Sequence, residues 1–306
     1  PRLVSSVGFP DPLAPKDLAV IDSTAWIVTQ FPNPFLVSID LSDPERPRLE
    51  RTIELPHAAT SIAANGDQLL LASQFDGLVL VDVSDPSTPT TVGSLNIRNS
   101  VVVASHANRA FVGTTTHRIH VVDISDPATP VEVSSMDYPY VAWPRDLVFS
   151  DGRLILGLED LDPMIVSPQG GLAVFDVSDP SAPNEIGYAP FSSGPERLAQ
   201  MGGTTLVADG DRGFRIFDIE SSGRPVEIAR RNVTMDAAFA VAVRHDLAYL
   251  ADDGLRVIDI SDHRAPKMVA SVELDGVTND VAVNEGADRI AVLSQRTALH
   301  VFSAVD

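Results

Sequence analysis

The chain is a succession of short apolar runs separated by turn sequences. Between residues 238 and 274, for example, the runs AFAVAVR, LAYLA, LRVIDI and PKMVASVEL follow one another with few residues between them. β-Branched and small apolar residues dominate and no helical period appears, which is typical of strands. Dipeptides such as Asn65-Gly66 and Asp151-Gly152 favour tight hairpin turns. The pattern predicts an all-β protein built from four-stranded units.

One motif recurs at the end of the third strand of each unit. It reads SIDLSDPERP, LVDVSDPSTP, VVDISDPATP, VFDVSDPSAP, IFDIESSGRP and VIDISDHRAP, with aspartates at Asp40, Asp82, Asp123, Asp176, Asp218 and Asp259. The spacings are 42, 41, 53, 42 and 41 residues, and a degenerate seventh copy, HVFSAVD, has Ser303 in the aspartate position. A four-stranded repeat of this length is typical of a propeller blade.

The seventh copy is not followed by a fourth strand. Residues Pro1 to Phe9, PRLVSSVGF, match the fourth strand PKMVASVEL of residues 266–274. We therefore expect the N-terminal segment to be the outer strand of the last blade, because closing the ring in this way removes exposed sheet edges. The prediction is a single domain over residues 1–306, a seven-bladed β-propeller of four-stranded antiparallel blades.

The SDPxxP segments are explained by turn chemistry. Asp and Ser accept hydrogen bonds from nearby backbone N–H groups, and Pro fixes its own backbone angle. The alternative, an array of metal sites, has less support. Asp209-Gly-Asp211 and Asp252-Asp253-Gly254 resemble fragments of calcium loops but lack the full ligand series with its terminal glutamate. We predict no cofactor and no metal site, with Ca²⁺ as the minor alternative.

The repeated segments resemble the LVIVD-repeat β-propellers of bacterial and archaeal surface or secreted proteins. The similarity rests on LVLVDVSDPSTP, VVDISDPATP and VIDISDHRAP and extends over the whole chain. It departs in the fifth copy, where Glu220-Ser-Ser-Gly223 replaces Ser-Asp-Pro, and in the seventh, which lacks the aspartate. The resemblance implies the architecture and a periplasmic, secreted or cell-surface location, with a signal peptide removed. It implies no common activity.

Charge excludes some partners. The 306 residues include 42 acidic and 22 basic side chains, for a net charge of −20. Such a field repels phosphate backbones, and no apolar run approaches the roughly 18 residues of a transmembrane helix. We expect no nucleic-acid partner, no membrane insertion and a monomer.

Variable loops gather on one face of the predicted ring, around the channel. Aligning the innermost strands by Leu18, Ile62, Val102, Leu147, Leu198, Val241 and Val281 places a pair of residues from each blade at the channel mouth. The pairs are Lys16-Asp17, Thr60-Ser61, Ser100-Val101, Arg145-Asp146, Glu196-Arg197, Phe239-Ala240 and Asn279-Asp280. Four pairs carry charge. They form either a polar binding funnel or a solvated, internally paired pore mouth.

The fourth blade departs from the repeat, since its spacing of 53 residues exceeds 42 by 11. The excess lies mainly in the segment from Glu159 to Gly171, EDLDPMIVSPQGG, between the second and third strands. The preceding loop holds Tyr138, Tyr140 and Trp143. These aromatic side chains either wall a ligand site or pack the insertion down.

Two functions remain open. The first is a binding module whose variable face and funnel take a small polar molecule or a protein partner through Lys16, Asp17, Trp143, Arg145, Asp146, Glu159, Glu196, Arg197, Phe239, Asn279 and Asp280. The alternative is a hydrolase, lyase or isomerase. It would use Asp146 or Glu196 as acid or base and Arg145 or Arg197 as anion anchor, with Tyr140 or His57 assisting. The sequence contains no HExxH, GxSxG, phosphate-binding glycine loop or cysteine.

Overall fold

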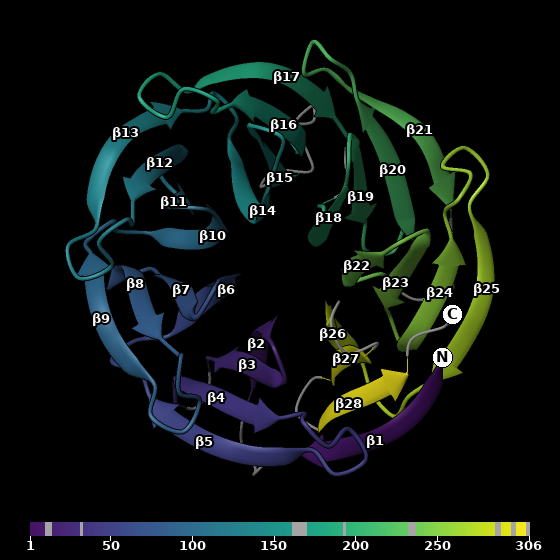
Figure 1. Ribbon diagram of the computed structural model, residues 1–306. Coiled ribbons are helices and arrows are strands. Elements are labelled where there is room, and N and C mark those ends of the chain that lie inside the picture. The colour runs from purple at the N-terminus through teal and green to yellow at the C-terminus, as the bar shows by residue number, and fades with distance from the viewer. Residues whose placement is uncertain are drawn as a thin grey trace.

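The computed structural model describes residues 1–9, 14–30, 33–160, 170–191, 194–231, 237–284, 289–294 and 298–303. These residues form 28 strands and no helix, in seven four-stranded antiparallel sheets around a central channel (Figure 1). The predicted seven-bladed β-propeller is therefore confirmed.

Each blade runs from its innermost strand outward. Blade 1 is β2 (Pro15–Ile21), β3 (Thr24–Thr29), β4 (Phe35–Asp40) and β5 (Arg48–Glu54); blade 2 is β6 (Ala59–Asn65), β7 (Gln68–Ser73), β8 (Gly77–Asp82) and β9 (Thr90–Leu95); blade 3 is β10 (Ser100–His106), β11 (Arg109–Thr114), β12 (Arg118–Asp123) and β13 (Val131–Asp137). Blade 4 is β14 (Ala142–Ser150), β15 (Arg153–Asp160), β16 (Gly171–Asp176) and β17 (Asn184–Pro190); blade 5 is β18 (Arg197–Met201), β19 (Thr204–Ala208), β20 (Phe214–Ile219) and β21 (Pro225–Arg231). Blade 6 is β22 (Ala240–Arg244), β23 (Leu247–Ala251), β24 (Gly254–Asp259) and β25 (Lys267–Glu273); blade 7 is β26 (Thr278–Asn284), β27 (Arg289–Ser294), β28 (Ala298–Ser303) and β1 (Arg2–Gly8).

The N-terminal strand closes the ring as predicted. β1 pairs antiparallel with β28, from Arg2 opposite Ser303 to Gly8 opposite Ala298. Figure 1 shows the purple start of the chain beside its yellow end. The outer edge of β28 is thereby paired, and the last blade is completed to four strands like the others.

The apolar core lies between blades rather than within them. Trp26 of β3 is fully buried and packs in one cluster with Ile62 and Leu69 of blade 2. Ile27, the next residue, faces the other way, into a cluster with Leu293 of blade 7. Successive side chains on a strand point to opposite faces of the sheet. Each blade therefore packs apolar side chains against both of its neighbouring blades. No blade can bury its apolar faces alone, so stability depends on the complete ring.

The turns between third and fourth strands use the chemistry expected from SDPxxP. Asp40 Oδ1 accepts the N–H of Ser42 at 2.8 Å, and Asp43 Oδ1 accepts the N–H of Glu45 at 3.1 Å. Asp82 makes the corresponding bond to Ser84 at 2.9 Å. The acidic side chains of these turns are therefore part of the turn structure.

The fourth blade has the longest inner hairpin among the described residues, with nine residues in β14 and eight in β15. The insertion was expected over residues 159–171, but Glu159 and Asp160 still belong to β15 and Gly171 begins β16. Residues 161–169 lie outside the described part of the chain.

Candidate functional site

A β-bulge at the start of the innermost strand directs side chains into the channel. In blade 1 the pairing register between β2 and β3 shifts between Pro15 and Asp17, so Lys16 is the extra residue. The same shift leaves Thr60, Val101, Arg145 and Asn279 as extra residues in blades 2, 3, 4 and 7. A bulge re-aims the side chain of its extra residue, and here all five point into one cavity.

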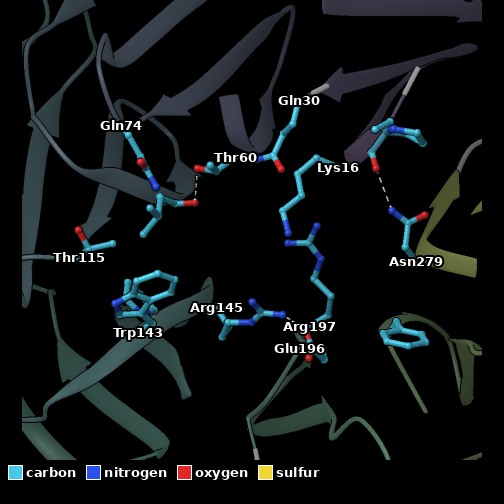
Figure 2. A pocket seen from close by; sticks show the side chains of 15 residues that line it. Lys16, Gln30, Thr60, Gln74, Thr115, Trp143, Arg145, Glu196, Arg197 and Asn279 are labelled. Atoms are coloured by element: carbon cyan, nitrogen blue, oxygen red, sulfur yellow. Dashed lines mark hydrogen bonds and ion pairs between the residues drawn. The ribbon is translucent and has the colours of Figure 1, made fainter. Parts of the chain in front are cut away.

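This cavity, which we call the funnel, has a volume of about 550 Å³ and lies at the end of the ring where the innermost strands begin. The bulged residues are joined in its wall by Glu196 and Phe239, which directly precede β18 and β22. Gln30, Gln74 and Thr115, each directly after a second strand, complete much of the lining (Figure 2). A cavity of this size is typical of small-molecule sites.

The aspartates that follow the bulge, predicted from the sequence to bind a ligand, form hydrogen bonds between blades instead. Asp17 Oδ2 accepts the N–H of Ile62 in blade 2 at 2.8 Å. Asp146 Oδ2 accepts the N–H of Leu198 in blade 5 at 2.7 Å, and Asp280 Oδ2 accepts that of Leu18 in blade 1 at 2.9 Å. Each aspartate thus links its blade to the next.

The other oxygen of each aspartate is occupied too. Asp17 Oδ1, Asp146 Oδ1 and Asp280 Oδ1 each accept the N–H of the residue that follows, at 2.9 Å. All three residues line a separate cavity of about 370 Å³ lower in the channel, not the funnel. The structure therefore places these predicted ligand-binding residues beneath the site, where they hold the blades together.

Arg197 forms the floor of the funnel. From blade 5 it reaches across the channel, with Nη2 at 2.5 Å from Asp17 Oδ1 and 3.4 Å from Asp280 Oδ2. Its Nη1 lies 4.0 Å from Asp146 Oδ1. It lines both the funnel and the lower cavity, so its guanidinium and the three carboxylates separate the two.

Burial and charge shift the pKa values in this cluster. Burial raises the pKa of Asp280 well above its ordinary value, Arg197 opposes the shift and Asp17 adds to it. Burial also raises the pKa of Asp146, against the effect of Arg197. Burial disfavours the charged form of Arg197, but the carboxylates of Asp17, Asp280 and Asp146 outweigh it and raise its pKa. Arg197 therefore stays charged, and its charge is offset from below.

Two further cations enter the funnel from its wall. Arg145 donates from Nη2 to Glu196 Oε2, and its Nη1 lies 3.5 Å from Glu159 Oε2. Lys16 has no ion pair or hydrogen bond with the described residues, and in Figure 2 its side chain extends toward Arg197. Burial lowers the pKa of the Lys16 amine, and the charges of Arg197 and Arg145 lower it further, while those of Asp17 and Glu196 oppose the shift. The ammonium group thus has carboxylates in its surroundings but no direct ion pair with the described residues.

The funnel also has an aromatic wall. Trp143 on β14 is 47% exposed and lines the cavity (Figure 2), as does Phe239. Trp143 therefore lies where it could contact a ligand, as one of the two predictions for the aromatic residues of this loop has it. Tyr138 is buried instead, and its hydroxyl donates to the Thr114 carbonyl at 3.0 Å.

Besides Asp17, Asp146 and Asp280, three further predicted site residues lie outside the funnel lining. His57 does not face the channel as expected: its Nδ1 lies 2.7 Å from Asp76 Oδ1, and its ring contacts Phe75. The hydroxyl of Tyr140 donates to Glu185 Oε1 on the outer strand β17 at 2.6 Å. Glu159 reaches the site only through Arg145. Each of the three is therefore engaged by another side chain of the protein.

The sequence alignment was one residue out of register in blade 3. The bulge makes Val101 the equivalent of Lys16, so the apolar anchor is Val103 rather than Val102. The N–H of Val103 accordingly meets Ser61 Oγ at 3.4 Å, as that of Ile62 meets Asp17. Gln30, Gln74 and Thr115 were missed altogether, although each follows its second strand directly.

Most of the acid and base groups predicted for the alternative, an enzyme, do not line the funnel. Of the six residues proposed for it, Arg145, Glu196 and Arg197 line the funnel. Asp146 has both oxygens bonded to backbone N–H groups. Glu196 is thus the carboxylate that lines the funnel among the described residues.

The aspartates of the two segments that resemble calcium loops pair with arginine side chains. Asp209 Oδ2 accepts from Arg215 Nε, and Asp252 Oδ2 accepts from Arg256 Nε at 3.0 Å. The two arginines are buried and pair also with Glu227 and Glu273 of the outer strands. Within the described residues, no group of three or more acidic or histidine side chains is arranged to hold a metal ion.

The fold and the funnel define a seven-bladed β-propeller with a ligand-sized polar cavity at one mouth of its channel. The family model for the LVIVD repeat matches residues 57–97, 102–138, 165–189 and 237–273. The chain thus carries the LVIVD repeat at four positions, consistent with the resemblance to the LVIVD-repeat propellers. A comparison with curated proteins found no match.

Several solved structures share the fold. U3-55K superimposes with a TM-score of 0.73 at 10% identity, covering 98% of this chain and 97% of its own. BamB from Moraxella catarrhalis gives 0.64 at 14% identity, with 96% and 84% covered. The Pan2 WD40 domain of Neurospora crassa gives 0.72 at 11% identity, with 100% and 95% covered. Identities this low establish the common fold alone. No helix able to cross a membrane occurs in the described part of the chain.

Proposed function

We propose that this protein is a binding module that takes a small polar molecule in the funnel. The observation that carries the proposal is the composition of the wall: charged, amide and hydroxyl side chains from six blades converge with a half-exposed tryptophan on about 550 Å³. Small-molecule sites combine an apolar surface with a few convergent polar groups in this way.

The positions of the polar groups support binding more than catalysis. They come from bulges and strand ends, which a closed ring of strands holds rigidly. Rigid placement lowers the ordering cost of binding. Beyond the funnel, the family resemblance and the acidic surface support an extracytoplasmic location, which fractionation of the native host with an antibody to this protein would test.

Trp143 provides a direct test. The chain has two tryptophans, and Trp26 is fully buried, so the fluorescence of Trp143 reports on the funnel. We expect a ligand found in a thermal-shift screen of sugars, organic acids and amino acids to shift the tryptophan emission. Trp143→Ala should remove that shift and weaken binding roughly tenfold, the scale of a lost aromatic contact.

Phe75→Ala is the matched control. Phe75 is an aromatic residue with 70% exposure that does not line the funnel. It should bind ligand like the wild type. Equal losses in both variants, or ligands that stabilise the protein without changing Trp143 fluorescence, would place the binding site elsewhere and refute the proposal.

A further inference from the structure

The charges of the funnel are unequally balanced. Arg197 has three carboxylates beneath it, and Arg145 is paired with Glu196. Lys16 has no partner among the described residues, although it lies close enough to Arg197 and Arg145 for their charges to lower its pKa. An anion placed between Lys16 and Arg145 would relieve this repulsion in a partly dehydrated space. Lys16 is therefore the funnel cation that a bound anion can pair with directly, whereas Arg145 and Arg197 already have carboxylate partners.

Glu196 indicates what kind of anion fits. Its carboxylate already lies on the guanidinium of Arg145 and projects from the funnel wall. A planar carboxylate matches the fork of an arginine. A ligand carboxylate can take the same place if Glu196 turns aside, so Glu196 acts as a resident counter-ion that competes with the ligand.

The remaining wall suits a hydroxyl-rich body. Asn279 Nδ2 donates to the Pro15 carbonyl at 3.1 Å and its Oδ1 is buried, so this amide is part of the funnel wall and is not free for a ligand. The amides of Gln30 and Gln74 offer donors and acceptors for ligand hydroxyls, and the ring of Trp143 offers a flat apolar face.

We propose that the funnel binds a sugar acid, a hydroxyl-bearing ring whose carboxylate is held between Lys16 and Arg145 in exchange for Glu196. This inference rests on the proposed function and specifies its ligand class. It assigns Lys16 and Arg145 to the acid group, the amides of Gln30 and Gln74 to hydroxyls and Trp143 to the apolar face of the ring.

The test compares matched sugars by calorimetry and Trp143 fluorescence. Glucuronate and galacturonate are set against glucose and galactose, which differ in the acid group, and against glucose 6-phosphate, which has a different acid. We expect the uronates to bind at least tenfold more tightly than the neutral sugars, with an affinity that falls as salt rises. A phosphate sugar that binds while the uronates do not would overturn the carboxylate assignment.

Three variants distinguish the roles. Lys16→Met should weaken uronate binding roughly tenfold or more, and Lys16→Arg should retain most of it. Glu196→Gln should strengthen uronate binding about threefold or more, because it removes the competing carboxylate while keeping the shape. Lys267→Met, which removes an equal charge from an exposed position on the outer strand β25, should leave binding unchanged.

The outcomes separate this inference from the proposed function. Uronates and neutral sugars that bind equally, with binding lost in Trp143→Ala, would overturn the sugar-acid inference and leave the binding module standing. Glu196→Gln that weakens binding as Lys16→Met does would overturn the counter-ion role. If none of these sugars binds but another small molecule shifts Trp143, the sugar-acid inference falls alone. If nothing binds in the funnel, both fall.

Discussion

Asp17 Oδ2 accepts the backbone N–H of Ile62, one blade further round the ring, at 2.8 Å. Through its other oxygen Asp17 holds the N–H of Leu18 and receives Arg197 at 2.5 Å. One carboxylate therefore joins two adjacent blades to a third across the channel. The floor of the funnel is a structural feature, and the ligand-directed groups lie above it.

Replacing Asp17 should destabilise the fold by more than the loss of one hydrogen bond would, because Asp17 makes several interactions. Asp17→Ala leaves the Ile62 N–H without an acceptor and removes the shortest ion pair of Arg197. We expect a loss of about 3 kcal/mol in the free energy of unfolding, measured by urea denaturation. Ser61→Ala is the control, since Ser61 is the blade 2 equivalent and its bond to Val103 is long, at 3.4 Å. That variant should lose less than about 1 kcal/mol, and equal losses would contradict the interpretation.

Ring closure gives a second prediction, on strand β1. Val7 packs against the core between blades 7 and 1, whereas Leu3 on the same strand is exposed. Val7→Asp should place a charge against the edge of that core and cost about 2 kcal/mol, while Leu3→Asp is tolerated. Hydrogen exchange should show lost protection in β28, the partner of β1, in Val7→Asp alone. Unchanged protection of β28 would mean that β1 does not close the ring in solution.

The repeat made the fold predictable, because every blade repeats the same strand and turn signals. The match between residues 1–9 and 266–274 was sufficient to predict ring closure. The channel mouth was predictable only as a set of pairs. Which member of a pair enters the funnel depends on a β-bulge, and the sequence carries no distinct signal for it.

The bulge explains the particular errors. It sends Lys16 into the funnel and turns Asp17 toward backbone N–H groups, although both are charged and adjacent. In blade 3 three consecutive valines, Val101 to Val103, offered no polar marker, so the alignment slipped by one residue. His57 was predicted to face the channel as a general base. The sequence could not show that Asp76, from a different loop, is its partner.

Acid should weaken the fold through the turn aspartates. The N–H and hydroxyl of Ser84 lower the pKa of Asp82, and those of Ser125 lower that of Asp123, both from an ordinary value of 3.8. A lowered folded-state pKa means that the stabilisation is complete above 3.8 and is lost as the pH falls through the folded-state pKa. We expect the urea midpoint to fall between about pH 4 and about pH 2.

The double variant Asp82→Asn, Asp123→Asn tests this assignment, because the asparagine oxygen keeps the turn bond but cannot titrate. It should show a shallower fall in midpoint at low pH. The buried Asp146 and Asp280 act in the opposite sense: their raised pKa values favour folding of the protonated form, so their penalty grows as the pH rises above 3.8. An acid limb as steep as in the wild type would assign it to other carboxylates.

The buried arginine of blade 5 gives the last prediction. Arg215 is almost fully buried, donates from Nε to the buried Asp209, and lies 3.0 Å from Glu227 Oε2. Its guanidinium carbon also lies 4.6 Å from the centre of the Phe191 ring. Arg215→Met leaves the Asp209 carboxylate buried without its counter-ion, and should cost about 3 to 5 kcal/mol in urea unfolding.

The added substitution Asp209→Asn should recover much of that loss, because the cost arises from the uncompensated charge rather than from the missing contact. Arg118→Met is the surface control: Arg118 pairs with Asp137 in the open, at 2.6 Å, and its loss should leave the midpoint unchanged. No recovery in the double variant would mean that Arg215 stabilises blade 5 mainly through packing on Phe191, and the equivalent Arg256 of blade 6 would then need the same test.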